Sequence, residues 1–144
     1  MIRLIFTFLF CLTAAITNAQ ATAKPFISRD SLNLYCDKIM QNFRDAKFSE
    51  GMQMFKRHSL LDIATIDNMD KTMIEQMANV LPVYKTVVGY ELIEEKSLKN
   101  TLVRRRYILK YENYFLTFDF ILYNNGSGWA VSNFIYKDAP MELF

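Results

Sequence analysis

The chain has few residues suited to metal binding or to disulfide formation. Its 144 residues include one histidine, His58, and two cysteines, Cys11 and Cys36. Zinc sites need about three or four cysteine, histidine or carboxylate ligands, so a histidine-based metal site is excluded. We therefore expect neither a metal nor another cofactor.

The net charge of the chain is also small. Seventeen Lys and Arg residues against 15 Asp and Glu residues leave a net charge of +2 at pH 7. This small surplus gives no electrostatic reason to expect nucleic acid or an acidic membrane as a partner. The sequence shows no internal repeat, low-complexity tract or interdomain linker, and its length suits one globular domain.

The first 19 residues have the features of a secretory signal peptide. Arg3 supplies a positive start, residues 4–12 form an apolar core, and the small residues 17–19 precede a cleavage site before Gln20. An uninterrupted membrane span would need about 20 apolar residues. We therefore expect residues 1–19 to be removed, the protein to be secreted or periplasmic, and no membrane span to remain.

The mature chain is predicted to be a flexible lead-in, residues 20–27, followed by a single domain, residues 28–144. Cys36 is then the one cysteine left, and it cannot form an internal disulfide. Its position on the apolar side of a predicted helix favours burial over pairing with another chain.

Three helices are predicted in the first half of the domain. Four apolar residues recur at helical spacings in the first: Leu32, Cys36, Ile39 and Phe43. This helix is expected to start at the N-cap Ser28, with Ile27 as part of a hydrophobic staple, and to end near residue 47. A short helix is predicted over residues 50–58. The third begins at Asp67 as N-cap and ends soon after Pro82.

Strands fill the second half of the domain. A first strand is predicted over residues 86–95, a turn over residues 96–100, and a meander over residues 101–137. If residues 112–113 form a hairpin loop, successive side chains point to opposite faces, and the pairs on one face are all apolar except at Arg105. These pairs are Tyr111 with Tyr114, Leu109 with Leu116, Tyr107 with Phe118, Arg105 with Phe120 and Val103 with Leu122.

The opposite face of this hairpin is mixed. It pairs Arg106 with Asp119 and Arg104 with Ile121, and the arginines lie across the preceding hairpin from glutamates in residues 91–95. Asn125-Gly126 marks the turn into the last strand, because it supplies the positive φ angles that a tight hairpin needs. In that strand either Ser132 or Asn133 is expected near Asp119.

Helices followed by strands predict an α+β fold, with three N-terminal helices packed on a curved antiparallel sheet of about four strands. The order of a long helix, a short helix, a third helix ending at Pro82 and long strands resembles the nuclear transport factor 2-like superfamily. The final stretch, residues 128–136, with Trp129 and Phe134, also resembles the last strand of its secreted bacterial members. One departure is that only residues 60–66 could supply a strand between the second and third helices.

The resemblance implies a curved sheet around the helices, with a pocket between them. Members include isomerases, dehydratases and non-enzymatic binding modules. The pocket is expected to be lined by apolar and aromatic residues of the third helix and the meander: Met73, Met77, Tyr107, Tyr111 and Phe118. Methionine suits an adaptable apolar pocket but equally fills a core, and core filling is the simpler interpretation.

Asp119 has two interpretations. Beside Arg106 it is a cross-strand ion pair on the outer face, which is the favoured one. In an apolar pocket its pKa would rise and it would suit a general base, with Tyr107 or Tyr111 as hydrogen-bond donors, as in some isomerases of the resembled superfamily. His58 would need a partner acid or nucleophile for catalysis, so a structural role is the simpler interpretation.

The sequence therefore favours an exported, non-enzymatic domain that binds a small apolar ligand or a protein partner between helices and sheet. The alternative is a small isomerase or lyase that uses Asp119. A homodimer through the mixed sheet face is also predicted, because apolar side chains lie among its polar ones. These are Phe115, Ile121, Tyr123 and either Val131 or Phe134.

Overall fold

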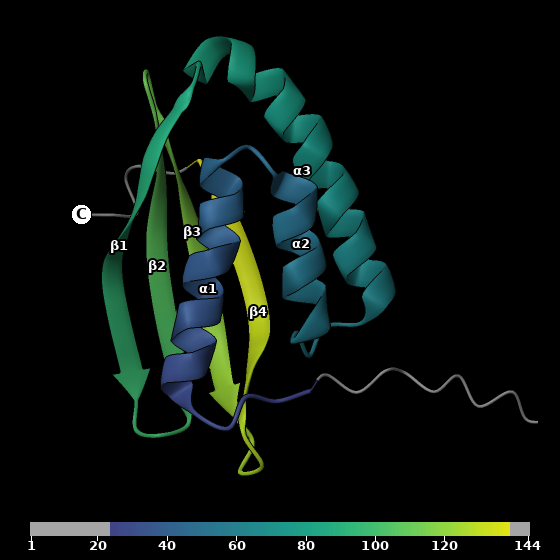
Figure 1. The fold of residues 1–144 in the computed structure, drawn as a ribbon, viewed down its shortest axis with the longest axis vertical. Coiled ribbons are helices and arrows are strands. Elements are labelled where there is room, and N and C mark those ends of the chain that lie inside the picture. The colour runs from purple at the N-terminus through teal and green to yellow at the C-terminus, as the bar shows by residue number, and fades with distance from the viewer. Residues whose placement is uncertain (1–23, 139–144) are drawn as a thin grey trace, which may run out of the picture.

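The computed structural model describes residues 24–138 as three helices followed by a four-stranded open antiparallel sheet (Figure 1). This confirms the predicted α+β class and the order of its elements. The predicted signal peptide, residues 1–19, lies outside the described residues. The elements are α1 Arg29–Arg44, α2 Phe48–Arg57, α3 Ile63–Tyr84, β1 Val87–Leu98, β2 Leu102–Tyr111, β3 Phe115–Asn124 and β4 Trp129–Lys137.

The three helices form a stack on one face of the sheet. Helix α1 packs against β1, β2 and β4, α2 packs against α1, and α3 packs against α2. In Figure 1 the C-terminal end of α3 reaches over the top of the molecule to the start of β1. Within residues 24–138, no helix is both long and apolar enough to cross a membrane.

Helix α1 begins as the sequence predicts. The Ser28 side chain accepts a hydrogen bond from the backbone N–H of Ser31 and so caps the helix. All four residues of its predicted apolar stripe are buried. The predicted staple is wrong, because the Ile27 side chain is 99% exposed. The helix ends at Arg44, just before Ala46, whose φ of +58° is incompatible with a continued helix.

Helix α3 is longer than the sequence predicts. Its N-cap is Asp62, whose Oδ1 accepts the backbone N–H of Thr65 at 2.9 Å, so the expected cap at Asp67 is wrong. Residues 60–66 therefore supply no strand between α2 and α3, although Ser59 makes one bridge to Val131. Pro82 lies inside the last turn, and the helix continues beyond it to Tyr84, followed by the C-cap Lys85, where φ is +65°.

The β2–β3 hairpin has the register that the sequence predicts, residue for residue from Val103–Leu122 to Leu109–Leu116. The β3–β4 pairing differs, because an irregularity between Ile121 and Leu122 shifts the register. Asp119 lies opposite Ile135, so the expected proximity to Ser132 or Asn133 is wrong. The extra residue also turns Val131 and Phe134 toward the helices, where both are buried, rather than onto the mixed face.

Aromatic side chains fill the space between the helices and the sheet. The Phe43 ring of α1 lies 5.3 Å from the Phe118 ring and 6.2 Å from the Phe134 ring, measured between centroids. Phe134 also lies 5.1 Å from Phe120 and 5.2 Å from Phe55 of α2. Rings at these separations attract one another in addition to burying apolar area. The core is therefore continuous from α2 to β3.

The segment before α1 is tied to the sheet. Phe26 and Trp129 exchange two backbone hydrogen bonds of 2.8 Å each, so the lead-in that the sequence predicts to be flexible is held at Phe26. Gly128 makes this approach possible, because a Cβ there would lie 2.7 Å from the Phe26 carbonyl oxygen. Its φ of +153° also favours glycine.

Replacing Gly51 by alanine is expected to destabilise the fold. A Cβ at this position would lie 2.4 Å from Cε1 of Phe43, a side chain with no exposed surface. Overpacking costs about 1–3 kcal/mol, and a separation as short as 2.4 Å belongs to the upper part of this range, about 2–3 kcal/mol, which exceeds the gain of about 1 kcal/mol in helix propensity. Urea unfolding should show a net loss of about 1–2 kcal/mol. Gly89→Ala is the control, because its Cβ would come no closer than 3.6 Å to a neighbour. An unchanged midpoint for Gly51→Ala would contradict this packing.

Candidate functional site

The five residues predicted to line a pocket belong to the core. Met73, Tyr107 and Phe118 have no exposed surface, and Met77 and Tyr111 are 3% and 4% exposed. The Tyr111 hydroxyl donates to the Met77 sulfur at 3.4 Å, which brings two of them together. The simpler interpretation of these methionines, core filling, therefore agrees with their burial.

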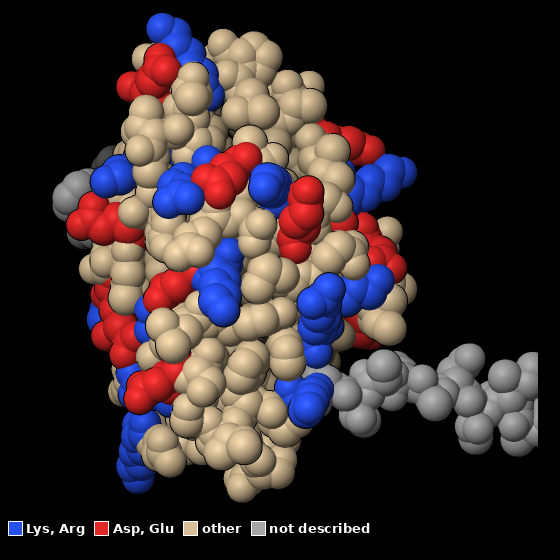
Figure 2. All heavy atoms as spheres, in the orientation of Figure 1, with Lys and Arg blue, Asp and Glu red and all other residues tan. Residues whose placement is uncertain are grey.

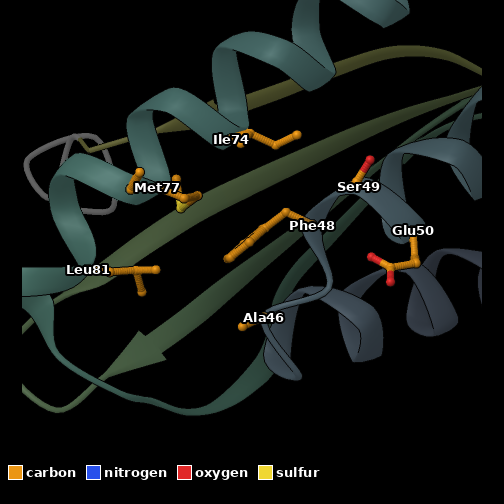
Figure 3. Close-up of a pocket in the computed structure, with 8 residues that line it drawn as sticks. Ala46, Phe48, Ser49, Glu50, Ile74, Met77 and Leu81 are labelled. Carbon is orange, nitrogen blue, oxygen red and sulfur yellow. The ribbon is translucent and has the colours of Figure 1, made fainter.

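Of these five residues, Met77 also borders a cavity of about 290 Å³, which we call the α2–α3 groove (Figure 3). The groove lies between the start of α2, with the loop before it, and the second half of α3. Its walls are mostly apolar, and only Ser49 and Glu50 bring polar side chains to it. The lining residues are Ala46, Phe48, Ser49, Glu50, Ile74, Met77, Ala78 and Leu81.

The groove follows from the spacing of apolar residues along α3. Ile74, Met77, Ala78 and Leu81 recur one turn apart, so they share the side of the helix that faces Phe48. The small side chain of Ala78 leaves room between the two helices. Residues 76–84 contain no charged side chain, and the surface over the upper turns of α3 is mostly tan in Figure 2. Residues 76–84 of α3 are thus uncharged both at the groove and beside it.

A buried carboxylate lies one turn before the groove. Asp70 precedes Ile74 on the same side of α3, and its Oδ2 accepts hydrogen bonds from Ser49 Oγ at 3.1 Å and Gln53 Nε2 at 3.3 Å. These bonds link α3 to α2 where the groove ends. Asp70 thus places a polar group at one end of the otherwise apolar groove.

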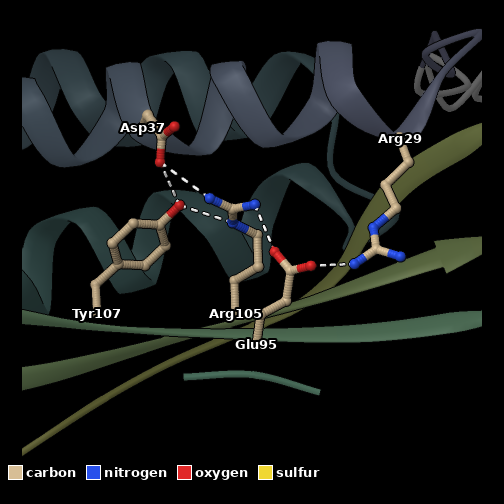
Figure 4. A network of polar contacts seen from close by, with 5 residues as sticks. All are labelled: Arg29, Asp37, Glu95, Arg105 and Tyr107. Atoms are coloured by element: carbon tan, nitrogen blue, oxygen red, sulfur yellow. Dashed lines mark hydrogen bonds and ion pairs between the residues drawn. The ribbon is translucent and has the colours of Figure 1, made fainter. Parts of the chain in front are cut away.

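A polar network fixes α1 on the sheet (Figure 4). The Arg105 side chain is only 6% exposed, and it donates to Glu95 of β1 at 2.7 Å, to Asp37 of α1 at 3.2 Å and to the Tyr107 hydroxyl at 2.8 Å. Tyr107 in turn donates to Asp37 at 2.5 Å, and Arg29 pairs with Glu95. Burial and the bond to Asp37 raise the pKa of Tyr107 above its usual range. Its hydroxyl is thus a committed structural donor.

Asp119 and Arg106 form the ion pair that the favoured interpretation predicts. Two bonds of 2.7 Å join the carboxylate to Nε and Nη2 of the guanidinium. By strand alternation the pair lies on the sheet face that points away from the helices. Asp119 therefore does not share a cavity with Tyr107 or Tyr111, which point toward the helices, and the three do not form a catalytic set.

The contacts of His58 and the burial of Cys36 both indicate structural roles. His58 Nδ1 is 2.7 Å from the Lys24 carbonyl oxygen, and its ring packs 4.3 Å from Phe26 and 4.8 Å from Tyr35, measured between centroids. Cys36 has no exposed surface, and burial raises the pKa of its thiol to about 12. In residues 24–138, no group of three or more His, Cys, Asp or Glu side chains is arranged to hold a metal ion.

A second cavity, of about 420 Å³, lies on the outer face of the sheet near the β1–β2 turn. We call it the outer-face groove. Its lining residues are Lys96, Leu98, Leu102, Val103, Arg104 and Ile121. The sequence-based prediction missed it because residues 96–98 were expected in a turn, whereas they extend β1 and pair with β2. The alternation of Lys96 and Leu98 with Ser97 was the available signal.

No protein-family model matches the chain, and neither does any curated protein or any solved structure. The resemblance to the nuclear transport factor 2-like superfamily therefore stays a prediction. The two grooves and the polar groups around them are therefore the features of the molecule that bear on its function.

Replacing Arg105 by methionine should destabilise the domain strongly. The change keeps the length of the side chain but leaves Asp37, Glu95 and the Tyr107 hydroxyl without their shared donor. Breaking a buried pair in this way costs about 2–4 kcal/mol. Arg104→Met is the matched control, since Arg104 also pairs with a β1 glutamate but is 34% exposed, and it should cost less than about 1 kcal/mol. Equal losses of unfolding free energy would contradict a special role for Arg105.

The Cys36 thiol should resist modification in the folded protein. In a Cys11→Ser background, its reaction with 5,5′-dithiobis(2-nitrobenzoate) at about pH 8 should be at least about 100-fold slower than in unfolding concentrations of urea, because the folded thiol is buried and protonated. Rapid labelling of the native protein would contradict its burial.

The same thiol makes stability fall in alkali. Burial raises its pKa from an ordinary 9.0 to about 12, so below pH 9 both states keep the proton. Above that, only the unfolded state releases it, and the thiol's contribution to stability falls by about 1.4 kcal/mol per pH unit. The pH dependence of urea unfolding should therefore be steeper than in Cys36→Ala.

Proposed function

We propose that this chain is an exported, non-enzymatic binding domain whose α2–α3 groove takes an apolar group from a small ligand or a protein partner. The observation that carries the proposal is the groove itself, an open cavity of about 290 Å³ with largely apolar walls. Ligand pockets usually measure about 300–1,000 Å³. A cavity just below this range suits one aromatic ring or one branched aliphatic group.

Three features support an apolar guest. Phe48 and Met77 give the groove a rigid ring on one side and a flexible thioether on the other, a combination that adapts to guest shape. Ile74 is 47% exposed beside it and Val83, at the end of α3, is 66% exposed, so apolar area remains to be covered. Exposed apolar patches often mark ligand-binding grooves or protein–protein interaction sites.

The alternative, an isomerase or lyase based on Asp119, has no supporting geometry. A general base must lie within hydrogen-bond reach of its substrate and have a displaced pKa or an apolar site. The Asp119 carboxylate is instead bound at both oxygens by Arg106, and the Tyr107 hydroxyl is bound by Asp37. The proposal is therefore a binding function.

Export and self-association complete the proposal as predictions from the sequence. The signal peptide implies a secreted or periplasmic protein. The sheet-mediated homodimer rests on fewer residues than expected, since Val131 and Phe134 are buried on the helix side. Phe115, Ile121 and Tyr123 remain partly exposed on the outer face.

Ala78→Trp should weaken binding strongly by filling the groove with an indole ring. Ala78 is exposed, so the fold should tolerate the change. Fluorescence titration with Nile red, an uncharged apolar dye, is expected to show saturable binding to the parent and at least about tenfold weaker binding to the variant. Ala64→Trp is the matched control, because Ala64 is an exposed alanine of the same helix outside the groove. Equal dye affinity of Ala78→Trp and the parent would reject the groove as the site.

A further inference from the structure

The outer-face groove combines an apolar floor with a cationic side. Cross-strand pairing places Leu98 opposite Leu102, and Lys96 opposite Arg104, which in turn lies opposite Ile121. Two adjacent rows of side chains thus cross the sheet, one apolar and one cationic. Leu98 is 69% exposed, although it borders a cavity of about 420 Å³.

The cationic row carries more positive than negative charge. Lys96 Nζ is 2.6 Å from Glu94 Oε1, and Arg104 pairs with the other oxygen of the same carboxylate. One glutamate therefore serves two cations, which leaves about one unit of positive charge at the groove. The Arg104 Nε–H is buried and finds no hydrogen-bond acceptor among residues 24–138, so one donor of this guanidinium is left unsatisfied there.

In the neighbouring row of side chains, the charges are paired differently. Arg106 and Asp119 are joined by two short hydrogen bonds. At the far end of the sheet, Lys110 pairs with its own partner, Glu91. The sharing of one glutamate by two cations, Lys96 and Arg104, is therefore not how every charged group on this face is paired.

We propose that the outer-face groove binds a single-chain amphiphile with a carboxylate head, such as a medium-chain fatty acid. The ligand carboxylate contacts Lys96 and Arg104 beside the Glu94 carboxylate that bridges them, through charge-assisted hydrogen bonds, and the chain lies over Leu98, Leu102 and Ile121. The volume of the cavity suits such a ligand. This site lies across the sheet from the helices and is independent of the α2–α3 groove.

Titration of the purified protein with decanoate and decyltrimethylammonium, each below its critical micelle concentration, and with 1-decanol below its solubility limit tests the assignment of the head group. Decanoate should bind saturably, decanol at least about tenfold more weakly, and the cation weaker still. Raising the salt concentration should weaken decanoate binding, because the head contact is partly exposed. Equal affinity for decanoate and decanol would overturn the proposal, and so would tighter binding of decyl phosphate than of decanoate.

Single substitutions test the location. Arg104→Gln and Lys96→Gln should each weaken decanoate binding about tenfold. Leu98→Ser, at an exposed position that the fold does not depend on, should weaken decanoate and decanol alike. Lys110→Gln is the matched control, since Lys110 also pairs with a β1 glutamate on this face, away from the groove, and decanoate affinity should not change.

Two results would reject the site. One is decanoate binding that survives all three groove substitutions but is lost in Ala78→Trp, which would move the ligand to the α2–α3 groove. The other is no decanoate binding together with a dimer in light scattering that Leu98→Ser dissociates, which would assign the face to a second copy of the chain. Failure of Nile red to bind the α2–α3 groove leaves these expectations unchanged.

Discussion

The position of the helices on the sheet depends on one buried guanidinium. Arg105 interrupts an otherwise apolar sheet face, and a charge placed there is costly unless every donor finds an acceptor. The acceptors come from α1, β1 and β2, so the cost is offset only when Asp37 lies directly above the strand pair. Apolar packing alone would allow α1 to slide along the sheet, and this network selects one placement.

The rest of the architecture follows from that placement. With α1 fixed, Phe43 lies over Phe118 and Phe134, and Gly51 lets α2 approach the Phe43 ring closely. Helix α3 then packs mainly on α2 and reaches the sheet through side chains such as Met77 and Tyr84, which leaves its second half and the loop before α2 slightly apart. The α2–α3 groove is thus a consequence of stacking three helices on a sheet that only the first contacts broadly.

The β2–β3 register could be predicted because a slip of one residue would exchange an apolar face for a mixed one. The same argument failed at β4, where one extra residue near Ser132 moves Val131 and Phe134 to the helix side without changing the composition of the strand. At α3, Asp62 and Asp67 are equally good caps by sequence, and the buried contact of Ile66 favours the earlier one. Met77 could be chosen from its stripe, but the groove beside it depends on the distance between two helices, which no local pattern encodes.

The backbone bonds of Phe26 have a further consequence for how this sheet meets other chains. Together with the bonds from Val131 to His58 and Leu60, they occupy the outward N–H and C=O groups along the first half of β4. At the opposite edge, β1 carries three glutamates, a lysine and two register irregularities, features that discourage strand addition. Strand addition is thus disfavoured at β1 and along the first half of β4, which favours contacts with another molecule through side chains on the two faces.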